Sequence, residues 1–401
     1  MEDLYWIFNY GFLGSRLFDL PNFMICVVLV LLGSRKLHVP AIIQLVLVLH
    51  CLLPFFLNGV LFDYGYMPDQ FKYWNWFNQI RSGQLPLTDA ITGGNTQQAA
   101  VFFALMPFPA AVAPLSLGFF NSFLYVFTFF WLYSKKVFTR FSMWFFLLYP
   151  SMALYSALSL RETLIMVFMI VAVQFAREGR WLSMGLVLVP LYLVKFQNFY
   201  ILAPILALYL VFGIRRTGLS IGKGAATAVI GFCSLLASAP VALPLVNKFR
   251  VAMFVEDGGH PDDIQLISSS LDFVVQGMTS SFYFLIKPLP WEITNALQLI
   301  QSIENIIVFG LLIIITRIAW KNAPKKLIFW LLLMLFSMSV YGLVVVNFGT
   351  AVRYRYPFVV IFVLFVCADC QIHRALPNFV FGNKGLSKPK PKLAHSQHQD
   401  I

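Results

Sequence analysis

The sequence predicts an all-α, polytopic integral membrane protein: a helical bundle of about eleven (about nine to twelve) transmembrane helices, with interfacial helices in its outer loops. Hydrophobic residues make up 59% of the chain and charged residues 11%, with a mean hydropathy of +0.77. Soluble domains hold roughly 45–50% apolar and about 25% charged residues. Long apolar runs such as "FMICVVLVLLG" and "IIVFGLLIIIT" alternate with short clusters of Lys and Arg.

The apolar runs predict the spans in chain order. Several are shorter than about 20 residues, so we expect them to be tilted or only partly immersed. Three prolines in 99–114, "AAVFFALMPFPAAVAP", argue against a regular span there and predict a re-entrant or interfacial helix. The predicted spans are 20–34, 40–62, 115–134, 141–159, 162–176, 181–195, 199–214, 223–247, 294–316, 326–346 and 357–373.

Basic residues predict the orientation. Most of the 29 Lys and Arg fall in one set of loops and in the C-terminal stretch, which the positive-inside rule places in the cytoplasm. The acidic N-terminus then lies outside, together with outer loops 63–98 and 248–291. We therefore expect one transmembrane domain over 1–373 and a basic, disordered cytoplasmic tail over 374–401.

The net charge of +12 does not indicate nucleic-acid binding, because it is concentrated in short loops and in the tail. The five cysteines lie in or beside apolar runs, which is typical of small buried side chains. We find no metal-ligand spacing, phosphate-binding loop or dinucleotide fingerprint, so we expect no metal and no cofactor.

A smaller set of ions lies on the predicted outer side, at helix ends. Any single basic residue there is explained as an interfacial anchor that snorkels to the headgroups. That several of them lie on the same, outer side instead favours an anionic ligand in the outer leaflet. The outer basic residues are Arg16, Lys72, Arg81, Arg161, Lys195, Lys248, Arg250, Lys287, Arg353 and Arg355.

The first outer loop, "FDYGYMPDQFKYWNWFNQIRSGQLP", predicts a short amphipathic helix that begins at Pro68–Asp69. Its aromatic residues, including Tyr73, would lie in the interface. Asp69 is either an N-cap carboxylate or a general base that takes a proton from a sugar hydroxyl. Tyr73 is a candidate for contact with the substrate.

The next two outer turns supply candidates of both charges. Arg161 would hold a phosphate while Glu162 caps the following helix, and the two neighbours should address different partners. Lys195 is a further candidate for phosphate binding. Gln197 and Asn198 suit either sugar hydroxyls or capping of the loop.

The last outer segments complete the candidate set. "KPLPWEITN" places Lys287, Trp291 and Glu292 at a rigid turn before a span, and Glu304 about three turns into it. In the extended segment expected for "VNFGTAVRYRYPF", Arg353 and Arg355 would point the same way and clamp a pyrophosphate.

Four of these segments together resemble bacterial polysaccharide-assembly membrane proteins, a group of GT-C-type polyprenol-dependent glycosyltransferases and Wzy-like and EpsG-like repeat-unit polymerases. The segments are "PDQFKYW", "YPS…YSALSLRE", "KPLPWEITNALQLIQSIEN" and "NFGTAVRYRYPF". The resemblance implies a multi-pass protein of the bacterial inner membrane that acts on polyprenyl-(pyro)phosphate-linked saccharides, beside other assembly proteins. It implies a base at Asp69 and phosphate contacts at Arg161, Arg353 and Arg355.

The chain departs from the transferase pattern in three ways. An apolar span precedes the one that leads into the Asp69 loop, and no second Asp adjoins Asp69. We also expect no soluble domain after the last span, a shape that fits the polymerases better. Glycosyl transfer on the outer face is the function we expect. A transporter or flippase of lipid-linked saccharides, and a non-catalytic component of a secretion complex, remain alternatives.

Overall fold

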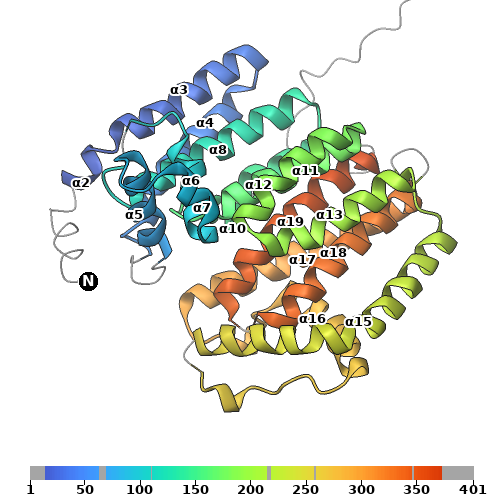
Figure 1. Ribbon diagram of the computed structural model, residues 1–401. Helices are drawn as coiled ribbons and strands as arrows, with labels where there is room; N and C mark the ends of the chain where they lie inside the picture. The colour runs from blue at the N-terminus through green and yellow to red at the C-terminus, as the bar shows by residue number, and fades with distance from the viewer. Residues whose placement is uncertain are drawn as a thin grey trace, which may run out of the picture.

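A computed structural model describes residues 14–62, 69–109, 111–214, 218–256, 259–345 and 347–372 (Figure 1). Within these ranges every named element is a helix, which confirms the predicted all-α class. Of the acidic residues near the N-terminus, Glu2 and Asp3 lie outside the described residues, as does the tail 374–401, whereas Asp19 is described and buried. The elements are α2 (Gly14–Leu17), α3 (Leu20–Leu37), α4 (Ala41–Leu57), α5 (Asp69–Arg81), α6 (Leu87–Thr92), α7 (Asn95–Ala104), α8 (Leu115–Ser134), α9 (Arg140–Leu148), α10 (Pro150–Tyr155), α11 (Glu162–Glu178), α12 (Trp181–Val194), α13 (Phe196–Val211), α15 (Ile221–Glu256), η2 (Pro261–Asp263), α16 (Ser270–Ile286), η3 (Pro290–Glu292), α17 (Ala296–Asn322), α18 (Pro324–Val344) and α19 (Phe348–Asp369).

In the described ranges, five helices are long and apolar enough to cross a membrane: α3, α8, α17, α18 and α19. The apolar helices α4, α12 and α13 are shorter. The structure thus supports a membrane protein but not the expected count of about eleven spans. One reason is local. The predicted span 141–159 breaks at Tyr149, whose backbone is extended (φ −67, ψ 113) because Pro150 disfavours helical geometry in the residue before it.

Helix α19 lies at the centre of the bundle and positions two of the candidate site residues. Its segment Tyr356–Cys367 is buried throughout, and it contacts α9, α10, α11, α16, α17 and α18. Arg353 and Arg355 stand near its N-terminus, and α19 therefore presents them to helices on different sides of the bundle.

The loops that the charge pattern grouped together also meet in space. Arg177 bonds Asp369 at 2.5 Å, Lys135 bonds Glu178 at 3.0 Å, and the backbone N–H of Leu219 donates to the Lys325 carbonyl at 2.6 Å. We call this the basic end. At the opposite end, which we call the site end, α8, α11 and α19 begin and α18 stops.

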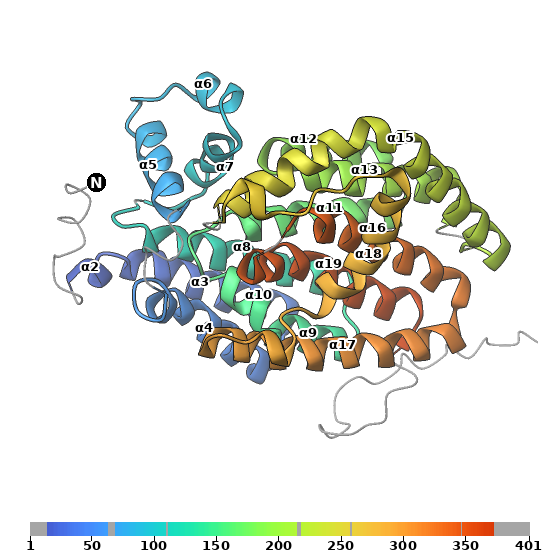
Figure 2. The same ribbon diagram turned by 90° about the horizontal axis from the view of Figure 1, so that it is seen from below.

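Helices α5, α6 and α7 form a cap at the site end, and Figure 2 shows them grouped together beside α8. The cap is tied down by hydrogen bonds to backbone carbonyls. Arg81 donates to the carbonyls of Ala104 and Met106, and Trp74 donates to that of Ala111. The predicted helix is present as α5, and its described part starts at Asp69. Its Tyr73 and Phe77, however, are buried against the protein and do not lie in the membrane interface.

Candidate functional site

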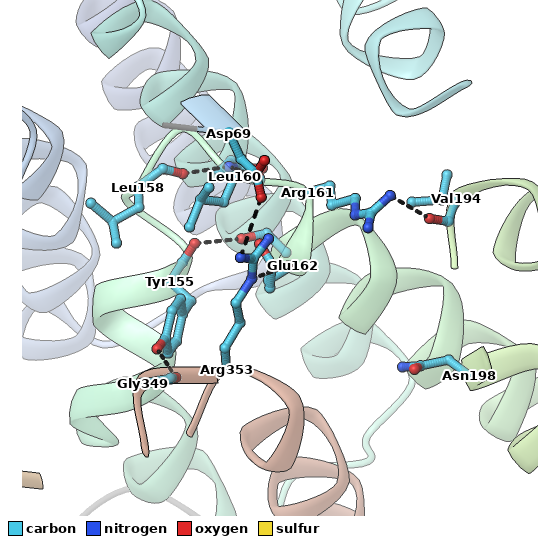
Figure 3. A network of polar contacts seen from close by, with 12 residues as sticks. Asp69, Tyr155, Leu158, Leu160, Arg161, Glu162, Val194, Asn198, Gly349 and Arg353 are labelled. Atoms are coloured by element: carbon cyan, nitrogen blue, oxygen red, sulfur yellow. Dashed lines mark hydrogen bonds and ion pairs between the residues drawn. The ribbon is translucent and has the colours of Figure 1, made fainter. Parts of the chain in front are cut away.

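A tightly held turn, residues 156–161, places the first two site residues. The Asn121 amide donates to the carbonyls of Leu158 and Leu160, both at 2.6 Å (Figure 3). Asn58 donates to the Ala157 carbonyl at 2.9 Å. These buried amides fix the backbone that leads into α11, and so fix the directions of Arg161 and Glu162.

Arg353 pairs with two carboxylates from distant segments. Its Nε lies 2.5 Å from Glu162 Oε1, and its Nη1 lies 3.7 Å from Asp69 Oδ2. Figure 3 shows the Arg353 guanidinium between these two acids. Glu162 is 2% exposed and stands in the first turn of α11, where the helix dipole also favours a negative charge.

Asp69 remains an ionised carboxylate in this setting. Burial alone would raise its pKa, but Arg353, and after it Lys72 and Arg161, hold the pKa below its usual value. The side chain is 36% exposed. A general base must be unprotonated before the reaction, and Asp69 meets that condition at neutral pH.

Arg161 and Lys195 are buried cations that lie beside the ion cluster. Arg161 donates to the Val194 carbonyl at 3.1 Å, and its guanidinium carbon lies 6.0 Å from the Tyr73 ring centroid. The Lys195 Nζ lies 3.9 Å from the Tyr354 ring centroid. Neither has a carboxylate partner among the described residues, although Lys195 hydrogen-bonds the Tyr354 side chain. Buried cations without a carboxylate partner are costly, so these two favour an anionic ligand.

Several buried polar atoms around the cluster have no hydrogen-bond partner in the described part of the chain. They are the Nε of Arg161, the second carboxylate oxygen of Glu162, the hydroxyl of Tyr73 and both amide atoms of Gln70. Gln70 and Tyr73 share one face of α5. Buried polar groups are nearly always bonded, so such a concentration indicates a place for water or a polar ligand.

Asn198 and Gln197 differ in how fully their amides are engaged. Asn198 accepts a short hydrogen bond from Tyr341 and donates to Met169 Sδ at 2.9 Å. Gln197 is half-buried, and its side-chain oxygen has no partner among the described residues. Gln197 is therefore the better placed of the two to take a new ligand.

The expected clamp of Arg353 and Arg355 is wrong. Both lie in helix α19, not in an extended segment, so their side chains diverge by about 200° around the axis. Arg355 is 2% exposed and donates to the carbonyls of Phe284, Leu285 and Lys287 and to the Asn305 side chain. It joins α16, α17 and α19 and has a structural role.

Three other predicted residues lie apart from the ion cluster. Lys287 is buried and donates to the Val345 carbonyl at 2.9 Å, beside Arg355. Glu292 accepts from the Leu289 N–H at 2.7 Å within its own turn, and Trp291 is 78% exposed. The sequence offered no partner for Glu304 within its predicted span. In the structure its carboxylate accepts hydrogen bonds from the backbone N–H and the hydroxyl of Ser151.

The sequence did not single out Gln70, Tyr354 or Tyr155. Gln70 lies next to Asp69 and one turn from Tyr73, so helical spacing alone could have found it. Tyr354 lies between the two candidate arginines in the sequence, and its ring faces Lys195. Tyr155 donates to the Gly349 carbonyl at 3.2 Å and stacks on Tyr356, a contact between α10 and α19 that no local pattern predicts.

Arg161 and Glu162 address different partners, as expected for neighbours on a helix start. Asp69, Tyr73, Arg161, Glu162, Lys195 and Arg353 thus converge at the site end from four separate segments. In the described ranges, no three His, Cys, Asp or Glu side chains gather as metal ligands. Comparison with family models, with curated proteins and with solved structures found no match to this chain.

Proposed function

We propose that this protein transfers a glycosyl group on the outer face of a bacterial inner membrane, from a polyprenyl-(pyro)phosphate-linked saccharide to a second saccharide. The observation that carries the proposal is the meeting of Asp69 with Arg161, Lys195 and Arg353 at one end of a membrane bundle. A partly exposed carboxylate beside Arg161 and Lys195, two buried cations without a carboxylate partner, is the pair of groups that such a transfer requires.

The chemistry follows from the donor. The acceptor hydroxyl oxygen attacks the anomeric carbon, and the bond from that carbon to the phosphate oxygen breaks. The proton of the hydroxyl passes to Asp69, and the electron pair leaves with the lipid phosphate. Arg161 and Lys195 stabilise the charge that develops on the leaving group. Arg353 holds Asp69 and Glu162 in place, so its role is to position the base.

The proposal includes the finer features expected from the sequence. The protein crosses the membrane several times with its N-terminus outside and its C-terminus in the cytoplasm, and the site end faces outward. Tyr73, Gln70 and Gln197 contact the saccharide or the phosphate. The absence of a second Asp beside Asp69 favours a repeat-unit polymerase over a single-addition transferase.

The test is to profile lipid-linked intermediates in a producing strain that carries Asp69→Asn, Arg161→Gln or Lys195→Gln. We expect product to fall by at least about a hundredfold for Asp69→Asn, the usual contribution of a positioned base. Lys136→Gln, at the basic end, is the matched control and should leave product unchanged.

The accumulated intermediate distinguishes the possibilities. Single lipid-linked repeat units indicate a polymerase, and a repeat unit that lacks one sugar indicates a transferase. Intermediates trapped on the cytoplasmic side indicate a flippase. Unchanged product from stably expressed Asp69→Asn protein would rule out the assigned base.

A further inference from the structure

An apolar groove runs between α17 and α18 and is also lined by residues of α16 and α19. It encloses about 680 Å³ and is lined by apolar side chains, among them Phe309, Ile313, Leu331, Leu335 and Phe362. At one limit it reaches Leu285 of α16 and at the other Arg317 and Lys321. In a bilayer such a groove is filled by hydrocarbon, because an empty one forfeits its dispersion contacts.

The charges at the basic end of the groove indicate which lipid fills it. Arg317 and Lys321 are one helical turn apart on α17, both exposed, and Trp320 beside them is 47% exposed. Within the described residues neither cation forms an ion pair with a carboxylate. Both are therefore available to an external anion.

The opposite limit of the groove offers no such cation. Arg355 is saturated by three backbone carbonyls and Asn305. Lys287 donates to the Val345 carbonyl. A negatively charged headgroup therefore has binding partners at the basic end of the groove and not at the site end.

The length of α17 places these cations at headgroup depth. Its 27 residues span about 40 Å, whereas the hydrocarbon core of a bilayer is about 30 Å thick. Because the apolar part of α17 occupies the core, its last turns project beyond it at the basic end. Arg317, Trp320 and Lys321 then lie among phosphates, where Trp is typically enriched.

We propose that the groove binds an anionic phospholipid of the leaflet at the basic end, with its headgroup on Arg317 and Lys321 and one acyl chain along Ile313 and Leu335. This site is separate from the proposed transfer site, and it holds whether or not the glycosyl-transfer proposal is correct. The bound lipid fills the space between α17 and α18.

The test reconstitutes the full chain in phosphatidylcholine vesicles that contain a small fraction of dibrominated lipid, which quenches nearby Trp. The Trp320 signal is the difference between the wild-type chain and Trp320→Phe. We expect dibrominated phosphatidylglycerol to quench Trp320 at a mole fraction on the order of tenfold lower than dibrominated phosphatidylcholine. Arg317→Gln with Lys321→Gln should remove that preference.

The matched control is Arg35→Gln with Lys36→Gln, a basic pair at the end of α3 that is remote from the groove, which should keep the preference. Equal quenching by the two lipids, or a preference that survives in the Arg317 and Lys321 variant, would overturn the proposal. Protection of Trp320 from both lipids together with a dimeric mass would overturn it in favour of a second copy of the chain.

Discussion

The guanidinium of Arg353, a residue of α19, links that helix to α5 and α11. Glu162, its closer partner, is almost fully buried, while Asp69 lies farther away and is partly exposed. The strong contact therefore holds the bundle together, and the weaker one leaves Asp69 free to exchange partners. Arg353 thus stabilises the bundle through Glu162 and positions the proposed base through Asp69.

Glu162→Gln should destabilise the protein by on the order of 3 kcal/mol, because it leaves the buried Arg353 charge without its main counterion. The measurement is thermal unfolding in detergent. The matched control is Glu178→Gln at the basic end. Its ion pair with Lys135 is partly exposed and contributes less than about 1 kcal/mol. Equal losses in the two variants would contradict the assigned role of Arg353–Glu162.

Arg353→Gln should move the acid limb of the rate–pH profile to higher pH. Burial raises the pKa of Asp69, and Arg353 is the largest influence that lowers it, so the pKa rises once the arginine is removed. In the native chain the ionised form is fully populated above about pH 4, the usual carboxyl pKa, and is lost only as the pH falls through the lowered value.

The comparison for this pH effect is Lys72→Gln. Lys72 also lowers the pKa of Asp69, but its side chain is 61% exposed and its charge is screened by solvent. A smaller shift is expected there. An acid limb that does not move in Arg353→Gln would show that Asp69 does not carry the pH dependence.

The sequence predicted part of the membership of this cluster. Charge and position selected Asp69, Arg161, Glu162, Lys195 and Arg353 because an ion at the end of an apolar span is conspicuous. Periodicity could not reveal that α19 begins before Arg353, since no apolar run marks its first turn. That error in secondary structure placed Arg355 in the clamp, and the helix turns it away.

Helices α16 and α18 pack so closely that a glycine is required where their backbones meet. A Cβ at Gly342 would lie 2.6 Å from the Ser280 carbonyl oxygen, so α18 and α16 meet only because this residue has no side chain. Gly310 on α17 has nothing within 4 Å of the same position. These two helical glycines form a matched pair.

Gly342→Ala should destabilise the α16–α18 contact by about 1–3 kcal/mol, the usual cost of overpacking. Gly310→Ala should be neutral or stabilising by up to about 1 kcal/mol, because alanine favours the helix. Thermal unfolding of both variants in the same detergent is the measurement. A loss at Gly310 as large as that at Gly342 would contradict the packing described for α16 and α18.

Element boundaries show where sequence reasoning fails in a bundle of this kind. The helix predicted after Pro68–Asp69 is present as α5, since that pair is a strong start signal. The predicted loop 248–291 instead contains the end of α15 and all of α16. Because α16 is only moderately apolar and packs on α18, its burial depends on tertiary contacts that no single segment encodes.

The two ends of the molecule differ in how their charged residues are arranged. The basic end gathers the clusters that the positive-inside rule uses, and its ion pairs, such as Arg177–Asp369, join the ends of α11 and α19. The site end gathers isolated ions of both signs. This separation was predictable from the sequence because topology is governed by loop charge, whereas the partners of each ion depended on the fold.

The membrane should therefore lie between the two ends, with the site end outside. A membrane-impermeant maleimide tests this in a chain whose exposed Cys233 is replaced by serine; Cys26, Cys51, Cys367 and Cys370 are buried. Gln84→Cys, exposed beyond α5, should be labelled in intact cells. Lys36→Cys, exposed at the end of α3, should be labelled only after the membrane is opened.

Other labelling results carry different meanings. The reverse pattern would place the Asp69 cluster in the cytoplasm, where the proposed donor would have to face inward and the function assigned to the outer leaflet would fail. Labelling of both positions in intact cells would mean that the two ends are not separated by a bilayer. Labelling of the Cys233→Ser parent would mean that a buried cysteine becomes accessible, and the two positions would then be read after subtraction of that signal. Only the outside label at Gln84 with the inside label at Lys36 agrees with the charge pattern, because the basic loop clusters would otherwise face outward, against the positive-inside rule.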